Sequence, residues 1–232
     1  MKKSILTLLL ASLTIGYSAA NAFVVDDPSG ASAASNAGAS PSAEYVAGAC
    51  HFRIANLFGG HFAADPKDSP PMGVYYFPSE GPFKSPVLYS GLGIFCIDAT
   101  DSDKIAARVG AKQVNGELLQ PDFSGDSLIW KPFDKQQHAE IITLSGKNWS
   151  GSGVLVDDTT GDEQTRSRNF SFCLIHDGHA LCSKLPIMYL SEPKVNELWK
   201  IKAILNSVEF IDGPISTVTD GMKPGSTAFP MK

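Results

Sequence analysis

The pair Asp177-Gly178 constrains this chain more than any other feature, because it joins two long apolar runs and Asp-Gly is the strongest short signal for a two-residue β-hairpin turn. The runs occupy residues 169–176 and 179–185. Both are rich in the apolar and aromatic residues that strands favour. The sequence therefore predicts an antiparallel hairpin in the middle of the domain.

The register of this hairpin predicts a disulfide. With a two-residue turn, His176 lies opposite His179 and Cys173 lies opposite Cys182. The pair that closes the turn is hydrogen-bonded and the pairs then alternate, so the two cysteines form a non-hydrogen-bonded pair, whose side chains lie closest. A cross-strand bond between them fits the geometry that a disulfide needs.

The first 22 residues have the pattern of a secretory signal peptide. Lys2 and Lys3 precede an apolar stretch over residues 5–15, and Ala20-Asn21-Ala22 has the small-x-small pattern of a cleavage site. The apolar stretch is too short to span a bilayer. Cleavage leaves Phe23 first, where a lipoprotein needs a cysteine, so we expect an exported protein without a membrane anchor, periplasmic or secreted.

Charge and cysteine content narrow the classes of partner and site. Removal of the signal peptide takes away two lysines and no acid, so the net charge falls from −5 to −7, which disfavours nucleic acid as a partner. The even cysteine number, the absence of Cys-x-x-Cys and the oxidising export compartment favour two disulfides over a metal site. If Cys173 pairs with Cys182, Cys50 is left to pair with Cys96. No cofactor is predicted.

Composition divides the exported chain into three parts. Residues 26–43 are almost wholly Ser, Ala, Gly, Asn, Pro and Asp, a composition that buries too little apolar surface to offset the entropy of ordering. Residues 23–43 therefore predict a flexible leader. Residues 44–212 predict a single folded domain. Residues 213–232, with three prolines, predict a flexible tail.

The predicted fold class is α+β, an antiparallel β-sheet with a long C-terminal helix packed on it and two disulfides. A short helix is expected to follow a cap at Thr100 or Asp101 and to end at Gly110. The long helix is expected after Pro193, where apolar residues recur at helical spacing. Short β-like segments predict strands over residues 50–54, 73–77, 92–97, 114–119, 127–130, 139–144 and 153–156.

Two groups of residues are candidates for a protein interface. Acidic residues crowd a turn around Gly161, and two histidines flank the hairpin turn; the candidates are Asp157, Asp158, Asp162, Glu163, His176 and His179. The acidic spacing does not follow a calcium-binding loop, and two histidines alone do not make a metal site, so neither group predicts a metal. Their positions leave open whether they lie near one another or at opposite ends of the sheet.

One motif invites a catalytic interpretation. Gly125-Asp126-Ser127-Leu128 matches the nucleophile motif of GDSL-type esterases, but no Asp-x-x-His follows near the C-terminus and the preceding residues resemble a loop rather than a strand. A simple turn is the better interpretation.

Two function classes remain. We expect a non-enzymatic binding protein whose partner is another protein, such as a cationic toxin or an envelope hydrolase that it neutralises, in the manner of an immunity protein. The alternative is a periplasmic hydrolase whose catalytic residues come together only in the fold.

Overall fold

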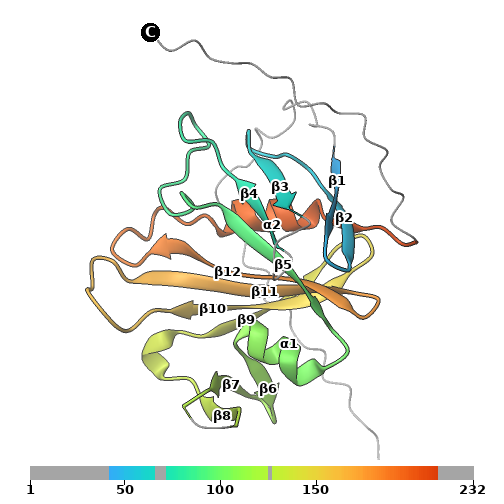
Figure 1. The fold of residues 1–232 in the computed structure, drawn as a ribbon. Helices are drawn as coiled ribbons and strands as arrows, with labels where there is room; N and C mark the ends of the chain where they lie inside the picture. Colours follow the sequence, from blue (N-terminus) through green and yellow to red (C-terminus); the bar gives the residue numbers. More distant parts are fainter. Residues whose placement is uncertain (1–41, 66–71, 125–126, 214–232) are drawn as a thin grey trace, which may run out of the picture. The chain divides into compact units, whose positions relative to one another are not determined.

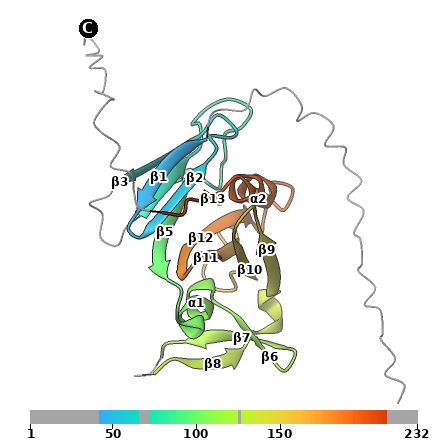
Figure 2. The same ribbon diagram turned by 90° about the vertical axis from the view of Figure 1, so that its right-hand side faces the viewer.

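A computed structural model describes residues 42–65, 72–124 and 127–213. The predicted signal peptide, residues 1–22, lies outside them, as do nearly all of the predicted leader and tail. Within the described residues the chain forms three antiparallel sheets and two short helices (Figures 1 and 2).

A seven-stranded sheet organises the described residues. In spatial order its strands are β3 (His61–Asp65), β4 (Met72–Tyr76), β5 (Leu92–Asp98), β12 (His179–Tyr189), β11 (Ser167–His176), β10 (Ser150–Asp157) and β9 (Glu140–Ser145). One small sheet contains β1 (Ala43–Ala47), β2 (Cys50–Ile54) and β13 (Glu209–Phe210), and another contains β6 (Lys112–Val114), β7 (Glu117–Asp122) and β8 (Ile129–Pro132). The helices are α1 (Ser102–Val109) and α2 (Leu198–Asn206), and one 3₁₀ turn, η1, spans Lys135–Gln137.

The central hairpin has the predicted register. Strands β11 and β12 meet at Asp177 and Gly178, whose φ angles of 41° and 78° are the left-handed values of a type I′ turn. Cys173 is the partner of Cys182 across the ladder and is disulfide-bonded to it. The second predicted disulfide, Cys50–Cys96, is also present and joins β2 to β5.

The predicted α+β class with a long C-terminal helix is wrong. Strands hold 47% and helices 12% of the described residues, so the fold is mostly antiparallel β. The apolar repeat that predicts the helix starts at Val195, but α2 spans only nine residues because both ends are tied to other groups. Before it, the Glu197 amide donates to the carbonyl of Ile187 on β12; after it, the Ser207 hydroxyl accepts from the Ala55 amide.

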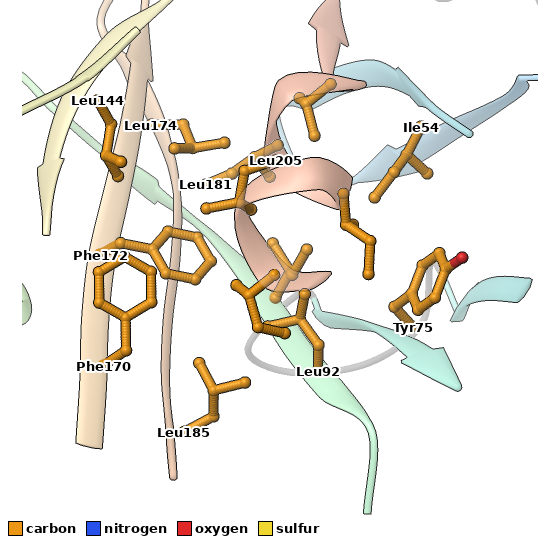
Figure 3. Packing of buried hydrophobic residues seen from close by; sticks show 14 of the residues in the cluster. Ile54, Tyr75, Leu92, Leu144, Phe170, Phe172, Leu174, Leu181, Leu185 and Leu205 are labelled. Carbon is orange, nitrogen blue, oxygen red and sulfur yellow. The ribbon is translucent and has the colours of Figure 1, made fainter. Parts of the chain in front are cut away.

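The larger core lies on one face of the seven-stranded sheet. Alternate residues of β11 and β12 point to this face, among them Phe170, Phe172 and Leu181, and all three are fully buried. Figure 3 shows that α2 lies between these side chains and Ile54 of β2. Helix α2 therefore packs between the seven-stranded sheet and β2, and it is too short to cover the whole core.

Helix α1 covers part of the opposite face. Its predicted cap is present: the Asp101 carboxylate accepts from the amides of residues 103 and 104, and Gly110 ends the helix with a φ of 86°. Ile105 and Val109 pack on the sheet together with the disulfide of Cys173 and Cys182. Because α1 has only eight residues, it leaves the rest of this face without a helix.

Candidate functional site: a groove on the sheet

The uncovered part of this face is a long open groove. It has a volume of about 1550 Å³ and runs over β4, β5, β12, β11 and β10, between α1 and the residues Gln120, Phe123 and Leu128 of the β7–β8 hairpin. Figure 1 shows α1 and the small β6–β8 sheet together on this side of β10, β11 and β12. The groove is larger than the hollow beside Arg166 and Leu190, which has a volume of about 390 Å³.

The floor of the groove is mostly apolar because of strand alternation. Residues that alternate with the core positions point here: Met72 and Val74 from β4, Phe95 from β5 and Val156 from β10. Gly93 lies between them, and a Cβ added there would meet only the Met72 sulfur, at 3.8 Å. Because Gly93 has no side chain, the groove is deeper at this position. Its backbone conformation is not one that requires glycine.

Three cationic side chains line the groove: Lys104 and Arg108 from α1, and Lys184 from β12. Lys104 lies 3.7 Å from Asp101, so it already has an anionic partner. The Arg108 guanidinium lies 4.7 Å from the centre of the Phe95 ring, a cation–π contact. Lys184 points to the same face from β12. Among the described residues no carboxylate lies within 4.0 Å of the charged group of Arg108 or of Lys184.

The carboxylates of the groove all have partners. Asp157 is buried, its Oδ2 accepts from Nδ1 of His138 at 2.9 Å, and its Oδ1 lies 3.1 Å from Nε of Arg168 in a close ion pair. Asp158 accepts from the amide and hydroxyl of Thr160, and these hydrogen bonds lower the pKa of its carboxyl group. The carboxylate of Asp98 accepts from Thr100 in the same way, which also lowers its pKa.

The four acidic candidates do not form one uniform surface. Asp157 belongs to the groove and serves its ion pair, and Asp158 lines the groove beside it. Asp162 and Glu163 are exposed in the turn that follows; Asp162 accepts from the Gln164 amide, and Glu163 lies 3.7 Å from Arg166. Of the four, only Asp162 and Glu163 form an exposed acidic edge.

The two candidate histidines lie at the other end of the sheet. Strand β11 separates the acidic turn from the hairpin tip by ten residues, a span of roughly 30 Å at the rise of a β-strand. Figure 1 shows the two turns at opposite ends of the strands. The question that the sequence leaves open is thereby answered: the histidines and the acidic turn are separate surfaces.

His176 is bound on both ring nitrogens. Nδ1 lies 2.6 Å from the carbonyl oxygen of Asn148, and Nε2 lies 2.6 Å from Oδ1 of Asp212. Partial burial of the ring lowers its pKa, but the hydrogen bonds to Asp212 and Asn148 outweigh that effect, so the pKa of His176 is raised. The ring also stacks on Phe210, 4.9 Å away. His176 thus holds the C-terminal strand to the β9–β10 turn.

Three other chemical interpretations can be compared with the structure. Within residues 42–65, 72–124 and 127–213, no three His, Cys, Asp or Glu side chains are grouped to hold a metal ion. Ser127 of the GDSL match is exposed, and Gly125 and Asp126 lie outside the described residues. His138, with Nδ1 on a buried carboxylate, has the arrangement of a positioned base, but no described hydroxyl or thiol hydrogen-bonds to its ring.

Sequence reasoning missed the residues that shape the groove. Arg108 is one of several charged residues on a short helix, and Lys184 is the one charged residue in a long apolar strand. Alternation along β12 assigns Lys184 to the face of Cys182, away from the core. The proximity of Arg108 to Phe95 depends on how α1 crosses the sheet, which no local pattern encodes.

Comparison with protein families, characterised proteins and solved structures finds no match to this chain. Among the described residues, no helix has the length and apolar content to cross a membrane.

Proposed function

We propose that this chain is an exported, non-enzymatic binding protein that captures another protein in the groove of its seven-stranded sheet. The observation that supports the proposal is the open sheet face itself, a cleft of about 1550 Å³ with an apolar floor and charged walls. Apolar floors with a few placed polar groups are typical of binding sites. The two disulfides are consistent with a periplasmic or extracellular address.

A rigid frame supports a role as an inhibitor. The groove lies on strands that are stapled at Cys173–Cys182, and β5 is linked to β2 by Cys50–Cys96. A pre-formed surface loses little entropy on binding, which favours tight and long-lived complexes. A protein toxin or an envelope hydrolase that must be held inactive is the class of partner that we propose.

The groove can be filled by one substitution. Gly93→Trp places a large ring on the floor at a position where a Cβ has room, so the fold should persist while the groove closes. Asn206→Trp is the matched control, because Asn206 is exposed at the end of α2, which packs on the opposite face of the sheet.

The test is capture of partners from envelope extract by the immobilised full exported chain, followed by binding measurements with the purified partner. We expect Gly93→Trp to abolish binding and Asn206→Trp to leave it unchanged. A partner that binds the Gly93→Trp variant with unaltered affinity would remove the groove from the function.

A further inference from the structure

We propose that the groove receives an extended segment of the partner that carries acidic side chains, and that Arg108 and Lys184 bind those side chains. This inference rests on the proposed function and specifies the chemistry of the bound segment.

The acidic and basic groups of the groove differ in their partners. Every carboxylate of the groove is engaged: Asp157 by Arg168 and His138, Asp158 and Asp98 by hydrogen bonds from neighbouring residues. Arg108 and Lys184 have no carboxylate within 4.0 Å among the described residues, although the charge of Lys184 acts on Asp158 at longer range. Both side chains are exposed, so water solvates them in the free protein. Each still has N–H groups that a ligand carboxylate can bind, with an attraction that adds to that of the apolar floor.

The contact of Arg108 with Phe95 leaves its guanidinium able to bind a carboxylate. Its guanidinium lies on the face of Phe95, 4.7 Å from the ring centre. Because a guanidinium that contacts a ring through its plane keeps its N–H groups at the edge, it can still donate two parallel hydrogen bonds to one carboxylate. The ring contact restricts the side chain, so less entropy is lost when the carboxylate binds.

The sheet opens beside Lys184 in a way that suits an extended segment. Strands β5 and β12 pair over only four positions, residues 95–98 with residues 179–182. Beyond Cys182, β12 has no ladder partner on the β5 side among the described residues, although the Ser183 hydroxyl still donates to the carbonyl of Gly93. Residues 184–186 therefore border the groove along an open strand edge.

An extended segment also fits a groove that has an apolar floor and cationic side chains beside it. Alternate side chains of a strand point to opposite sides, so one set can lie on Met72, Val74 and Phe95 while the other set reaches the cations. A basic segment would place like charges next to Arg108 and Lys184. The acidic character of the bound segment follows from that repulsion as much as from the attraction.

The experiment uses the full exported chain and short labelled peptides in which valine alternates with glutamate, glutamine or lysine. We expect the glutamate peptide to bind about tenfold or more tightly than the glutamine peptide at low salt, and to lose affinity as salt is added. The lysine peptide should bind most weakly.

The decisive variant is Arg108→Gln with Lys184→Gln. We expect this double substitution to lower the affinity for the glutamate peptide about tenfold and to leave the affinity for the glutamine peptide unchanged. Lys194→Gln with Lys202→Gln is the matched control, since it removes the same charge from exposed positions at and near α2 and should change neither affinity.

Several outcomes would overturn the inference: equal binding of the three peptides, tighter binding of the lysine peptide, an unaffected double variant, or binding of a fatty acid such as laurate in place of all peptides. The proposed function is tested separately by the captured partner. If the partner fails to bind Gly93→Trp but binds the Arg108/Lys184 variant normally, the groove remains the site and only the acidic segment is rejected.

Discussion

The imidazole of His176 lies between two acceptors, so it is best satisfied when both nitrogens carry protons. Its raised pKa has a defined consequence for stability. A group whose pKa is higher in the folded state stabilises the protein fully below its unfolded pKa, about 6.5 for histidine, and loses that contribution as the pH rises through the folded pKa.

We therefore expect His176→Gln to cost most stability at acidic pH and least at alkaline pH. The measurement is the free energy of unfolding in denaturant for both proteins at several pH values on either side of about 6.5. Asp212→Asn removes one acceptor charge and should narrow the pH range over which His176 stabilises the fold. A difference between the two proteins that is constant with pH would show that His176 contributes only by packing.

The buried carboxylate of Asp157 gives a second prediction at this scale. Asp157→Asn keeps the shape but leaves Arg168 without its counter-charge, so we expect a loss of about 1–3 kcal/mol in the free energy of unfolding. Glu163→Gln is the control. Its side chain is 85% exposed, so we expect a change within about 0.5 kcal/mol. Similar losses in the free energy of unfolding for both variants, measured by denaturant melts, would contradict the distinction between buried Asp157 and exposed Glu163.

At the scale of elements, the features that the sequence predicts correctly are those set by residues close together in the chain. The hairpin turn at Asp177-Gly178 and the cap at Asp101 are set by residues next to one another in the chain, and both predictions are confirmed. The length of α2 is decided by hydrogen bonds to Ile187 on β12 and to Ala55, which lies 152 residues from Ser207, so helical spacing overestimated it. The predicted fold class failed for the same reason.

The candidate site follows the same division. Alternation along β12 is enough to place Lys184 on the face away from the core. The groove itself depends on α1 being short and on β5 separating from β12 beyond Cys182, and both are tertiary facts. The acidic turn is visible in the sequence, whereas the engagement of Asp157 by Arg168 and His138 is not.

The two disulfides differ as elements. Cys50–Cys96 closes 46 residues and links two sheets, while Cys173–Cys182 closes nine residues between strands that are already paired. Loop-closure entropy predicts losses of about 4 and about 3 kcal/mol on removal. We expect Cys50→Ala with Cys96→Ala to unfold at lower denaturant concentration than Cys173→Ala with Cys182→Ala. The reverse order would mean that packing around the hairpin bond outweighs chain entropy.

At the scale of the whole molecule, the boundaries of the folded domain can be tested. The predicted leader and tail contribute little apolar sequence, so a chain of residues 42–213 should melt cooperatively near the temperature of the exported protein. A chain of residues 42–207 should melt at a clearly lower temperature, because it loses β13 and the Val208 carbonyl that accepts from the Trp149 indole. Thermal unfolding followed by circular dichroism distinguishes the two truncations. A marked fall for residues 42–213 would show that a removed end packs on the domain.

The burial of the hairpin disulfide under α1 also sets an order of chemical events. Cys173 and Cys182 have no exposed surface and pack against Ile105 and Val109, whereas Cys96 is only half-buried. A thiol reductant in solution must reach a sulfur atom before it can attack. It should therefore cleave Cys50–Cys96 while the domain is folded, and Cys173–Cys182 only in the moments when α1 has lifted from the sheet. The rate of reduction of Cys173–Cys182 in the folded protein therefore measures how often α1 opens.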